Sequence, residues 1–195
     1  MSPDDRHPPV PAPIRIAYLG NLPEVARRLA DLPGVELAAC LVEEGDAEVS
    51  EIENTFAGTG TAVCRVRNRQ DVKRALRGCG PITQALMANF GIILDREILG
   101  IPADGCVNAH FGLLPTYPGR NPLLEALANG DRVVGVTLHR VTEKIDGGPI
   151  LETRTLAVGE SAVPYDVFMG MRGLVMRLLS DHLDSLKARP DGFSR

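Results

Sequence analysis

The chain has 195 residues and a formal net charge of −4, and 44% of its residues are hydrophobic and 24% charged. This balance is typical of a globular protein, and the length suits one domain with a sizeable core. With a pI near 5.6, the chain lacks the basic character that binds nucleic acid by counterion release, and no apolar run reaches the length of a membrane span. We expect a cytoplasmic enzyme of small molecules with no nucleic-acid or membrane partner, and a homodimer stays open.

The segment 1–13, MSPDDRHPPVPAP, is acidic and rich in proline. It lacks the basic stretch and following apolar stretch of a signal peptide, so the sequence predicts a flexible leader. A single catalytic domain is expected over residues 14–188, with a short tail at 189–195.

Four cysteines are scattered along the chain without C-x-x-C spacing. Such spacing predicts neither a disulfide framework nor a zinc site, and we expect no metal. Reduced, mostly buried thiols are expected at Cys40, Cys64, Cys79 and Cys106.

Strands and helices are predicted to alternate along the first half of the chain. Ile14–Gly20 is an apolar run that ends in glycine, and apolar residues at helical spacing follow it. Strands are also predicted at Val35–Glu43 and, after a polar connection with one short helix, at Thr61–Val66. The next helix opens at Asn68 and closes at Gly78.

The second half begins with a buried strand in Ile82–Leu94 that breaks at Phe90–Gly91, and Asp95 is the expected cap of a short helical turn. Gly105–His110 is predicted to be the fifth strand and Asn121–Gly130 a helix. Two strands follow within residues 133–158, and a long helix ends the domain. The expected core stripe of that helix is Val167, Phe168, Met171, Leu174, Val175, Leu178, Leu179 and Leu186.

This order of elements predicts the fold class. Alternating strands and helices favour a parallel sheet flanked by helices, whereas the two consecutive strands within 133–158 require antiparallel pairing. We therefore expect one α/β domain with a Rossmann-like mixed, mostly parallel sheet, helices on both faces and a long C-terminal helix.

Polar side chains gather where ligands bind in such folds, at the carboxyl ends of the strands. Asn108 and His110 are two residues apart, so they project from one face of the fifth strand, and Asp146 lies in the loop TEKIDGG. An amide and an imidazole that hydrogen-bond an oxyanion, with a carboxylate to orient the imidazole, suit acyl transfer. The alternative is a structural histidine and an ordinary Asp-Gly-Gly turn, and spacing alone leaves both open.

The segments NAHFGLLPTYPG and GVTLHRVTEKIDGGPIL together resemble the signature of the folate-dependent formyltransferases. The family pattern is Asn-x-His, Leu-Leu-Pro with a nearby glycine, a Thr-x-His strand and an Asp-x-Gly loop. The resemblance is strong from about residue 86 to 151. The matching residues are Asn108, His110, Leu113, Leu114, Pro115, Gly119, Thr137, His139, Asp146 and Gly148.

The resemblance implies that 10-formyltetrahydrofolate is the co-substrate and that an amine attacks its formyl carbon. Asn108 and protonated His110 are then expected to stabilise the oxyanion, each contributing about 3 kcal/mol or more, while Asp146 supports His110 and relays the proton of the amine. Thr137 and His139 share one face of their strand and are expected behind the loop that carries Asp146.

The resemblance also implies a folate site between NFGIIL and VTEKID, formed largely by backbone groups. For any one side chain of GIIL, a place in the core strand is an equal alternative. The residues concerned are Phe90, Gly91, Ile92, Leu94, Val141, Thr142, Glu143, Lys144 and Ile145.

The acceptor is less well defined. LGNLPEVA replaces the glycine-rich loop with which the glycinamide ribonucleotide enzymes hold a phosphate, and the acidic chain of 195 residues argues against tRNA. PGRNPLLEALANG resembles the sugar-type members, which predicts an amino sugar nucleotide or a similar biosynthetic amine. Tyr117, Arg120 and Asn121 are expected to contact it, with Arg120 on an anionic group.

Alternatives from other classes stay open. One is a glycinamide ribonucleotide-type or amino-acid-type formyltransferase, and another is a folate-binding relative without activity. A nucleotide-binding Rossmann protein rests only on IAYLGN, whose single glycine falls short of the dinucleotide fingerprint.

Overall fold

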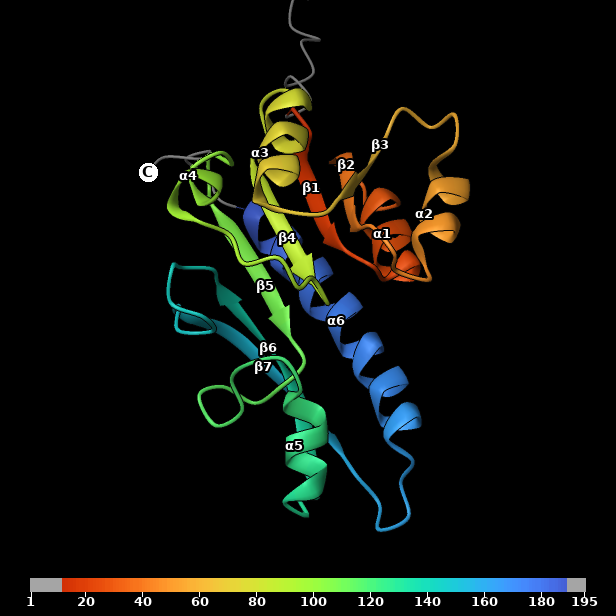
Figure 1. The fold of residues 1–195 in the computed structure, drawn as a ribbon, viewed down its shortest axis with the longest axis vertical. Helices are drawn as coiled ribbons and strands as arrows, with labels where there is room; N and C mark the ends of the chain where they lie inside the picture. Colours follow the sequence, from red (N-terminus) through yellow and green to blue (C-terminus); the bar gives the residue numbers. More distant parts are fainter. Residues whose placement is uncertain (1–11, 189–195) are drawn as a thin grey trace, which may run out of the picture.

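The computed structural model describes residues 12–188 as a seven-stranded sheet with helices on both faces (Figure 1). The predictions for 1–11 and 189–195 lie outside the described residues. In space the strands follow the order β3-β2-β1-β4-β5-β6-β7. Their bounds are β1 (Ile14–Gly20), β2 (Val35–Glu43), β3 (Ala62–Val66), β4 (Gln84–Ala88), β5 (Cys106–His110), β6 (Val133–Arg140) and β7 (Ile150–Ala157).

The direction of pairing changes across the sheet. Strands β1 to β5 pair in parallel, whereas β5 with β6 and β6 with β7 pair antiparallel. This confirms the predicted mixed sheet. A turn after Asp146 returns the chain from β6 to β7, and it needs glycine because a Cβ on Gly148 would lie 1.8 Å from the carbonyl oxygen of Arg140.

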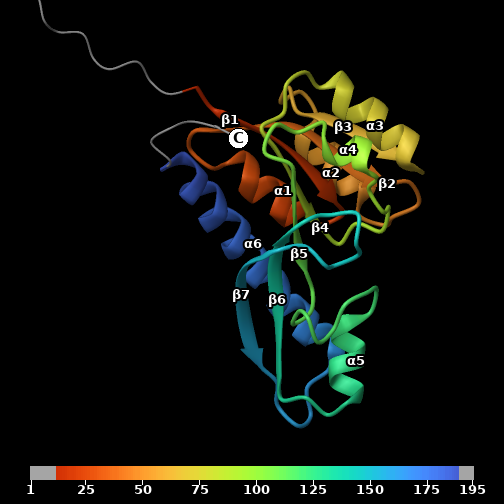
Figure 2. The same ribbon diagram turned by 90° about the vertical axis from the view of Figure 1, so that its left-hand side faces the viewer.

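The helices bury their apolar stripes on the two faces of the sheet. Their bounds are α1 (Pro23–Ala30), α2 (Val49–Phe56), α3 (Arg69–Gly78), α4 (Arg96–Leu99), α5 (Pro122–Ala128) and α6 (Pro164–Lys187). One core cluster holds residues of α1, α2, α5 and α6, and the second holds residues of α3 and α4. Figures 1 and 2 show α6 running along the sheet beside α1, with α5 beyond the carboxyl end of β5 and beside the start of β6.

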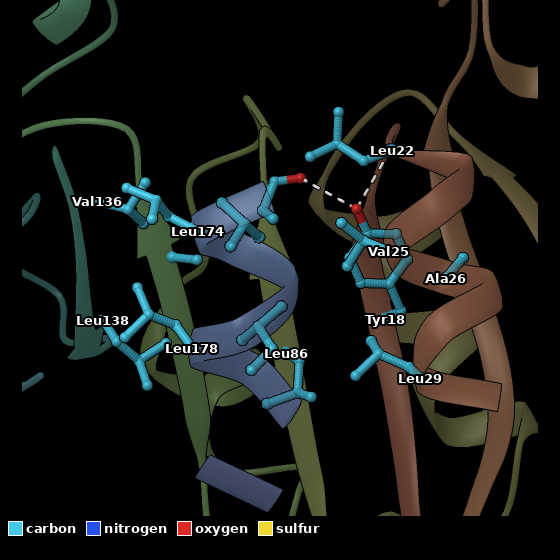
Figure 3. Packing of buried hydrophobic residues seen from close by; sticks show 14 of the residues in the cluster. Tyr18, Leu22, Val25, Ala26, Leu29, Leu86, Val136, Leu138, Leu174 and Leu178 are labelled. Carbon is cyan, nitrogen blue, oxygen red and sulfur yellow. Dashed lines mark hydrogen bonds between the residues drawn. The ribbon is translucent and has the colours of Figure 1, made fainter. Parts of the chain in front are cut away.

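The larger core is shown in Figure 3, where Leu174 and Leu178 of α6 lie among Leu86 and Leu138 of the sheet. The fully buried Tyr18 keeps its hydroxyl satisfied by accepting from the backbone N–H of Leu22 at 3.2 Å and donating to the carbonyl of Ala88 at 3.4 Å. Desolvation by burial holds the pKa of this phenol well above its usual value.

Most predicted elements are confirmed, including Asn68 and Asp95 as side-chain caps. The stripe of α6 is buried as predicted except that Phe168 is only partly buried, and Leu183 belongs to it as well. The strand predicted to break at Phe90–Gly91 already ends at Ala88. Asn89 takes a φ of +54°, a left-handed conformation that asparagine tolerates better than most residues.

All four cysteines are unpaired, as predicted, with Cys40 and Cys106 buried and Cys64 and Cys79 partly exposed. Burial raises the pKa of the two buried thiols to about 12. Within residues 12–188, none of the helices combines the length and the apolar character needed to cross a membrane.

Candidate functional site

The polar side chains singled out in the sequence come together across the antiparallel pair β5–β6. Asn108 lies opposite His139, and His110 lies opposite Thr137. Because alternate residues of a strand share a face, all four side chains belong to one face of the sheet. The switch from parallel to antiparallel pairing therefore brings together two motifs that are some 30 residues apart in sequence.

Asn108 and His139 are joined by a direct hydrogen bond, with 3.2 Å between the amide Nδ2 and the imidazole Nε2. The other ring nitrogen of His139, Nδ1, lies 3.0 Å from the carbonyl of Arg140, which can only accept. Nδ1 therefore carries the proton and Nε2 accepts from Asn108. Burial lowers the pKa of His139, which favours this neutral form. The second hydrogen of the Asn108 amide stays available to another acceptor.

His110 is held by the loop that follows its own strand. Its Nε2 donates to the carbonyl of Tyr117 at 2.7 Å, and the imidazole is 6% exposed. The opposite nitrogen, Nδ1, lies 3.7 Å from Oδ2 of Asp146. Since Nε2 is engaged, Nδ1 is the ring nitrogen that faces the Asp146 carboxylate. The loop approaches so closely that a Cβ on Gly112 would lie 2.9 Å from Nε2 of His110.

Asp146 lies between the two imidazoles. One carboxylate oxygen is 3.7 Å from His110 Nδ1 and the other 3.6 Å from His139 Nε2. The backbone N–H of Gly119 donates to Oδ2 at 2.8 Å, which fixes the carboxylate against the loop after β5. Asp146 itself has a φ of +48°, a costly conformation for a residue with a side chain, and such strain is frequent at functional sites.

The side chains of Asn108, His110, His139 and Asp146 line one cavity of about 450 Å³. The predicted folate residues that also line it are Phe90, Gly91, Ile92, Leu94, Val141, Thr142 and Ile145. Most of their side chains are apolar, so they form a hydrophobic wall beside the polar cluster, the usual composition of a site for a small ring system.

Other predicted site residues do not line this cavity. Glu143 and Lys144 are exposed, and Asn121 is exposed at the start of α5. The side chain of Tyr117 points away, because its hydroxyl donates to Asp131 at 2.6 Å and accepts from Asn129 at 3.2 Å. Tyr117 contributes through its backbone carbonyl instead, and its predicted contact with the acceptor is corrected.

Thr137 and His139 differ in their positions. Thr137 is fully buried, donates to the carbonyl of Gly112 at 2.7 Å and accepts from the N–H of Leu114 at 3.1 Å, so it anchors the loop after β5. His139 belongs to the cavity lining but is only 2% exposed, and its Nε2 lies 3.6 Å from Asp146, so its place behind the Asp146 loop stays a prediction. The bond to Asn108 accounts for its position in the lining.

Two polar side chains near the cavity have no counterpart among the predicted site residues. Asn89 lines the cavity and donates to the Oδ1 of Asn21 at 2.7 Å. Glu43 accepts from the backbone N–H of Gly91 at 2.5 Å. Both lie at the carboxyl ends of strands, the edge where ligands are expected, so the strand order was the signal that pointed to them. Among residues 12–188, no group of His, Cys, Asp and Glu side chains has an arrangement that could hold a metal ion.

A model of the formyl transferase family matches residues 46–164, more than half of the chain. The methionyl-tRNA formyltransferase of Mycobacterium avium (strain 104) is 30% identical over 187 residues, which cover 89% of this chain and 58% of that protein. That of Methylococcus capsulatus is 36% identical over 99 residues, which cover 51% of this chain and 32% of that protein. The chain thus spans less than two thirds of the length of either relative.

Among solved structures, phosphoribosylglycinamide formyltransferase from Bacillus halodurans superposes with a TM-score of 0.77 at 22% identity, covering 91% of this chain and 97% of that one. This likeness confirms the predicted fold. The relatives named here are methionyl-tRNA and phosphoribosylglycinamide enzymes, so they do not support a closer kinship with the sugar-type members. The matched family model covers the Asn-x-His strand and the Asp-x-Gly loop alike, and the chain belongs to the formyl transferase family.

Proposed function

We propose that this protein transfers a formyl group from 10-formyltetrahydrofolate to a primary amine of a small acceptor. The observation that carries the proposal is the convergence of Asn108, His110 and Asp146 on one cavity with an apolar wall. The formyl transferase family takes its formyl group from this folate. The pteridine ring is proposed to lie against the wall formed by Ile92, Ile145 and their neighbours.

The proposed reaction is a nucleophilic acyl transfer. The lone pair of the amine forms a bond to the formyl carbon, and the carbonyl oxygen becomes an oxyanion. The bond to N10 of the folate then breaks as the carbonyl re-forms, and tetrahydrofolate leaves with the proton that the amine has lost. The protein has to stabilise the oxyanion and carry that proton.

Asn108 supports the first of these tasks. One of its two amide hydrogens is donated to His139, so the amide is held in a single orientation, and the second hydrogen is available to the oxyanion. A donor fixed before the reaction pays no reorganisation cost during it, which is why such donors are effective in a site sheltered from water.

His110 and Asp146 support the second task. With Nε2 of His110 held by Tyr117, an imidazolium directs its Nδ1–H toward Asp146 and the cavity. The Asp146 carboxylate is 12% exposed and keeps one oxygen oriented by Gly119. It is therefore placed to accept the proton of the attacking amine and to stabilise the neighbouring imidazolium.

The acceptor is proposed to be of the amino-acid or aminoacyl type. A phosphate held by the first turn after β1 is disfavoured, because Pro23 has no N–H and the N–H of Leu22 already donates to Tyr18. The amide of Asn21 in the same turn donates to the Asp46 carboxylate, so an anion meets a negative side chain there. The relatives described above likewise give no support to an amino sugar nucleotide as the acceptor.

The test is release of tetrahydrofolate from 10-formyltetrahydrofolate in the presence of a panel of primary amines, with the N-formyl product identified by mass spectrometry. We expect release that depends on the amine and on Asn108. The control without amine reports spontaneous hydrolysis. Folate binding without amine-dependent release for any member of the panel would favour the alternative, a folate-binding relative without activity.

A further inference from the structure

Two opposite charges flank the backbone of Gly91 at the edge of the cavity. A methyl group built on Gly91 would lie 3.3 Å from both carboxylate oxygens of Glu43 and 3.4 Å from Nη2 of Arg120. The ion pairs of residues 12–188 do not include one between Glu43 and Arg120. A small group placed over Gly91 is therefore within reach of a carboxylate on one side and a guanidinium on the other.

Arg120 lines the cavity, and its guanidinium forms neither a hydrogen bond nor an ion pair with any other residue of the described part of the chain. It directly follows Gly119, whose N–H binds the carboxylate of Asp146. The guanidinium is thus connected to the reacting end of the site by one peptide unit. A guanidinium offers a planar fork of donors that suits a carboxylate.

Glu43 is the last residue of β2, and it is held in place because it accepts from the N–H of Gly91 at 2.5 Å. A carboxylate with two oxygens keeps acceptor capacity beyond this one bond. Glu43 is therefore placed to bind a cationic group of the acceptor.

From this pair we infer that the acceptor is an α-amino acid with a primary amine on its side chain, its carboxylate bound by Arg120 and its α-ammonium by Glu43. The inference rests on the proposed function, since it names the substrate class of the same site. The side-chain amine is the group that reaches Asp146 and receives the formyl group. The α-ammonium stays protonated and bound by a carboxylate, so it does not compete as a nucleophile.

The experiment compares three probes that differ by one charged group. L-ornithine carries a carboxylate, an α-ammonium and a side-chain amine, whereas putrescine lacks the carboxylate and 5-aminovalerate lacks the α-ammonium. Their binding to the full chain is measured by calorimetry in the presence of tetrahydrofolate, and formyl transfer is measured in parallel. L-2,4-diaminobutyrate and L-lysine vary the spacing between the head group and the reacting amine.

We expect the wild-type protein to bind L-ornithine about tenfold or more tightly than either truncated probe, the effect of one charged hydrogen-bonding contact. Arg120→Ala should remove the preference for L-ornithine over putrescine, which lacks the carboxylate, and keep the preference over 5-aminovalerate. Glu43→Gln should remove the preference over 5-aminovalerate, which lacks the α-ammonium, and keep the preference over putrescine. Arg120→Lys restores charge without the fork and should restore the preference only in part. Matched controls are Arg96→Ala and Glu125→Gln, which change exposed residues outside the cavity and should leave both preferences unchanged.

Equal binding of the three probes, or the same loss of preference in both variants, overturns the inference. So does tighter binding of glycinamide ribonucleotide than of L-ornithine. If the preferences appear but no probe releases tetrahydrofolate, the proposed function fails while the zwitterion site stands. If amines release tetrahydrofolate and neither variant changes a preference, the inference alone fails.

Discussion

Two regions of the sheet's carboxyl edge are built differently. At the β5–β6 end, Asn108, His139 and His110 come from the strands themselves and are joined to each other or to the backbone by short bonds. On the β2–β4 side, Glu43 is the last residue of β2 and Asn89 follows β4, and both contact loops. The first group is fixed by sheet register, and the second by contacts between strand ends and loops.

This difference separates two requirements of an enzyme. Transition-state stabilisation needs groups that hardly move, and cross-strand pairs within a sheet provide them. Choice of acceptor needs groups that change between relatives without disturbing the sheet, and strand-end loops allow that. We therefore expect substitutions of Asn108, His110 and Asp146 to lower kcat, and substitutions of Glu43 and of Arg120, in the loop after β5, to change KM of the amine.

The largest effect is expected for His110→Ala. Loss of an oxyanion donor or of the charge beside it should lower kcat by about two to three orders of magnitude, with little change in either KM. Asn108→Ala should behave alike. Steady-state kinetics with both substrates varied measures this, and circular dichroism checks that the fold is intact. Turnover near the wild-type value in either variant contradicts the assignment.

Asp146→Asn should lower kcat by about a hundredfold, because the amide keeps the bond from Gly119 and tolerates the positive φ but cannot accept a proton. The affinity for tetrahydrofolate should stay the same, since the folate contacts are expected to be backbone and apolar ones. A tenfold loss of folate affinity with kcat preserved makes Asp146 a binding residue, which calorimetry with tetrahydrofolate detects.

A smaller effect is expected for His139, a positioning residue that acts through Asn108. His139→Gln should lower kcat by about tenfold, because the fixed orientation of the amide is lost while the amide itself remains. A defect as deep as that of His110→Ala would falsify this role. The conservative His139→Asn, with a shorter side chain, should be no more active than the glutamine variant.

His139 also predicts a pH dependence of stability. Its pKa is lowered from 6.5 chiefly by burial and also by His110, against the opposing effects of the Arg140 carbonyl and Asp146. As pH falls, the unfolded chain binds the proton first, so the stabilisation is complete above about pH 6.5 and is lost toward the folded-state pKa. Tm of the wild type should fall more steeply between about pH 7 and 5 than Tm of His139→Gln. If Tm falls equally with pH in the wild type and in His139→Gln, His139 does not contribute this pH dependence.

The smallest effect is expected for Tyr117→Phe. Its hydroxyl bonds to Asp131 and Asn129 rather than to the cavity, so the variant should lose about 1 kcal/mol of folding free energy and keep KM for every amine. Urea unfolding and kinetics measure the two quantities. A raised KM for the amine would show that the Tyr117 hydroxyl contacts the acceptor. It would also weaken the contrast between the two regions of the sheet edge.

Much of the fold could be predicted from the sequence, because local sequence signals mark where its strands and helices begin and end. Apolar runs that end in glycine, the caps Asn68 and Asp95, and the proline in the first turn of α5 each predict an element independently of tertiary contacts. The early end of β4 was missed, because the left-handed conformation of Asn89 depends on its bond to Asn21, far away in sequence.

The site was predictable to the extent that motif and strand face determine it. The faces of Asn108, His110 and His139 follow from alternation, but their register does not, so the direct bond of His139 to Asn108 was not foreseen. Tyr117 was misplaced because a side chain in a turn has no periodicity to orient it. Glu43 was overlooked because a glutamate ending a strand is usually solvated, and only the approach of Gly91 distinguishes it.

The cross-strand pair of Asn108 and His139 has a consequence for how such enzymes diversify. Asn108, His110, His139 and Asp146 all lie in one uninterrupted stretch of chain that includes β5 and β6. That stretch could be transferred as one block into a related protein, provided that β5 of the block pairs with β4 of the recipient sheet. Arg120 moves with the block, whereas Glu43 and Asn89 remain in the recipient. A chimaera should therefore inherit its chemistry and the contact with the acceptor carboxylate from the donor, and the contact with the α-ammonium from the host.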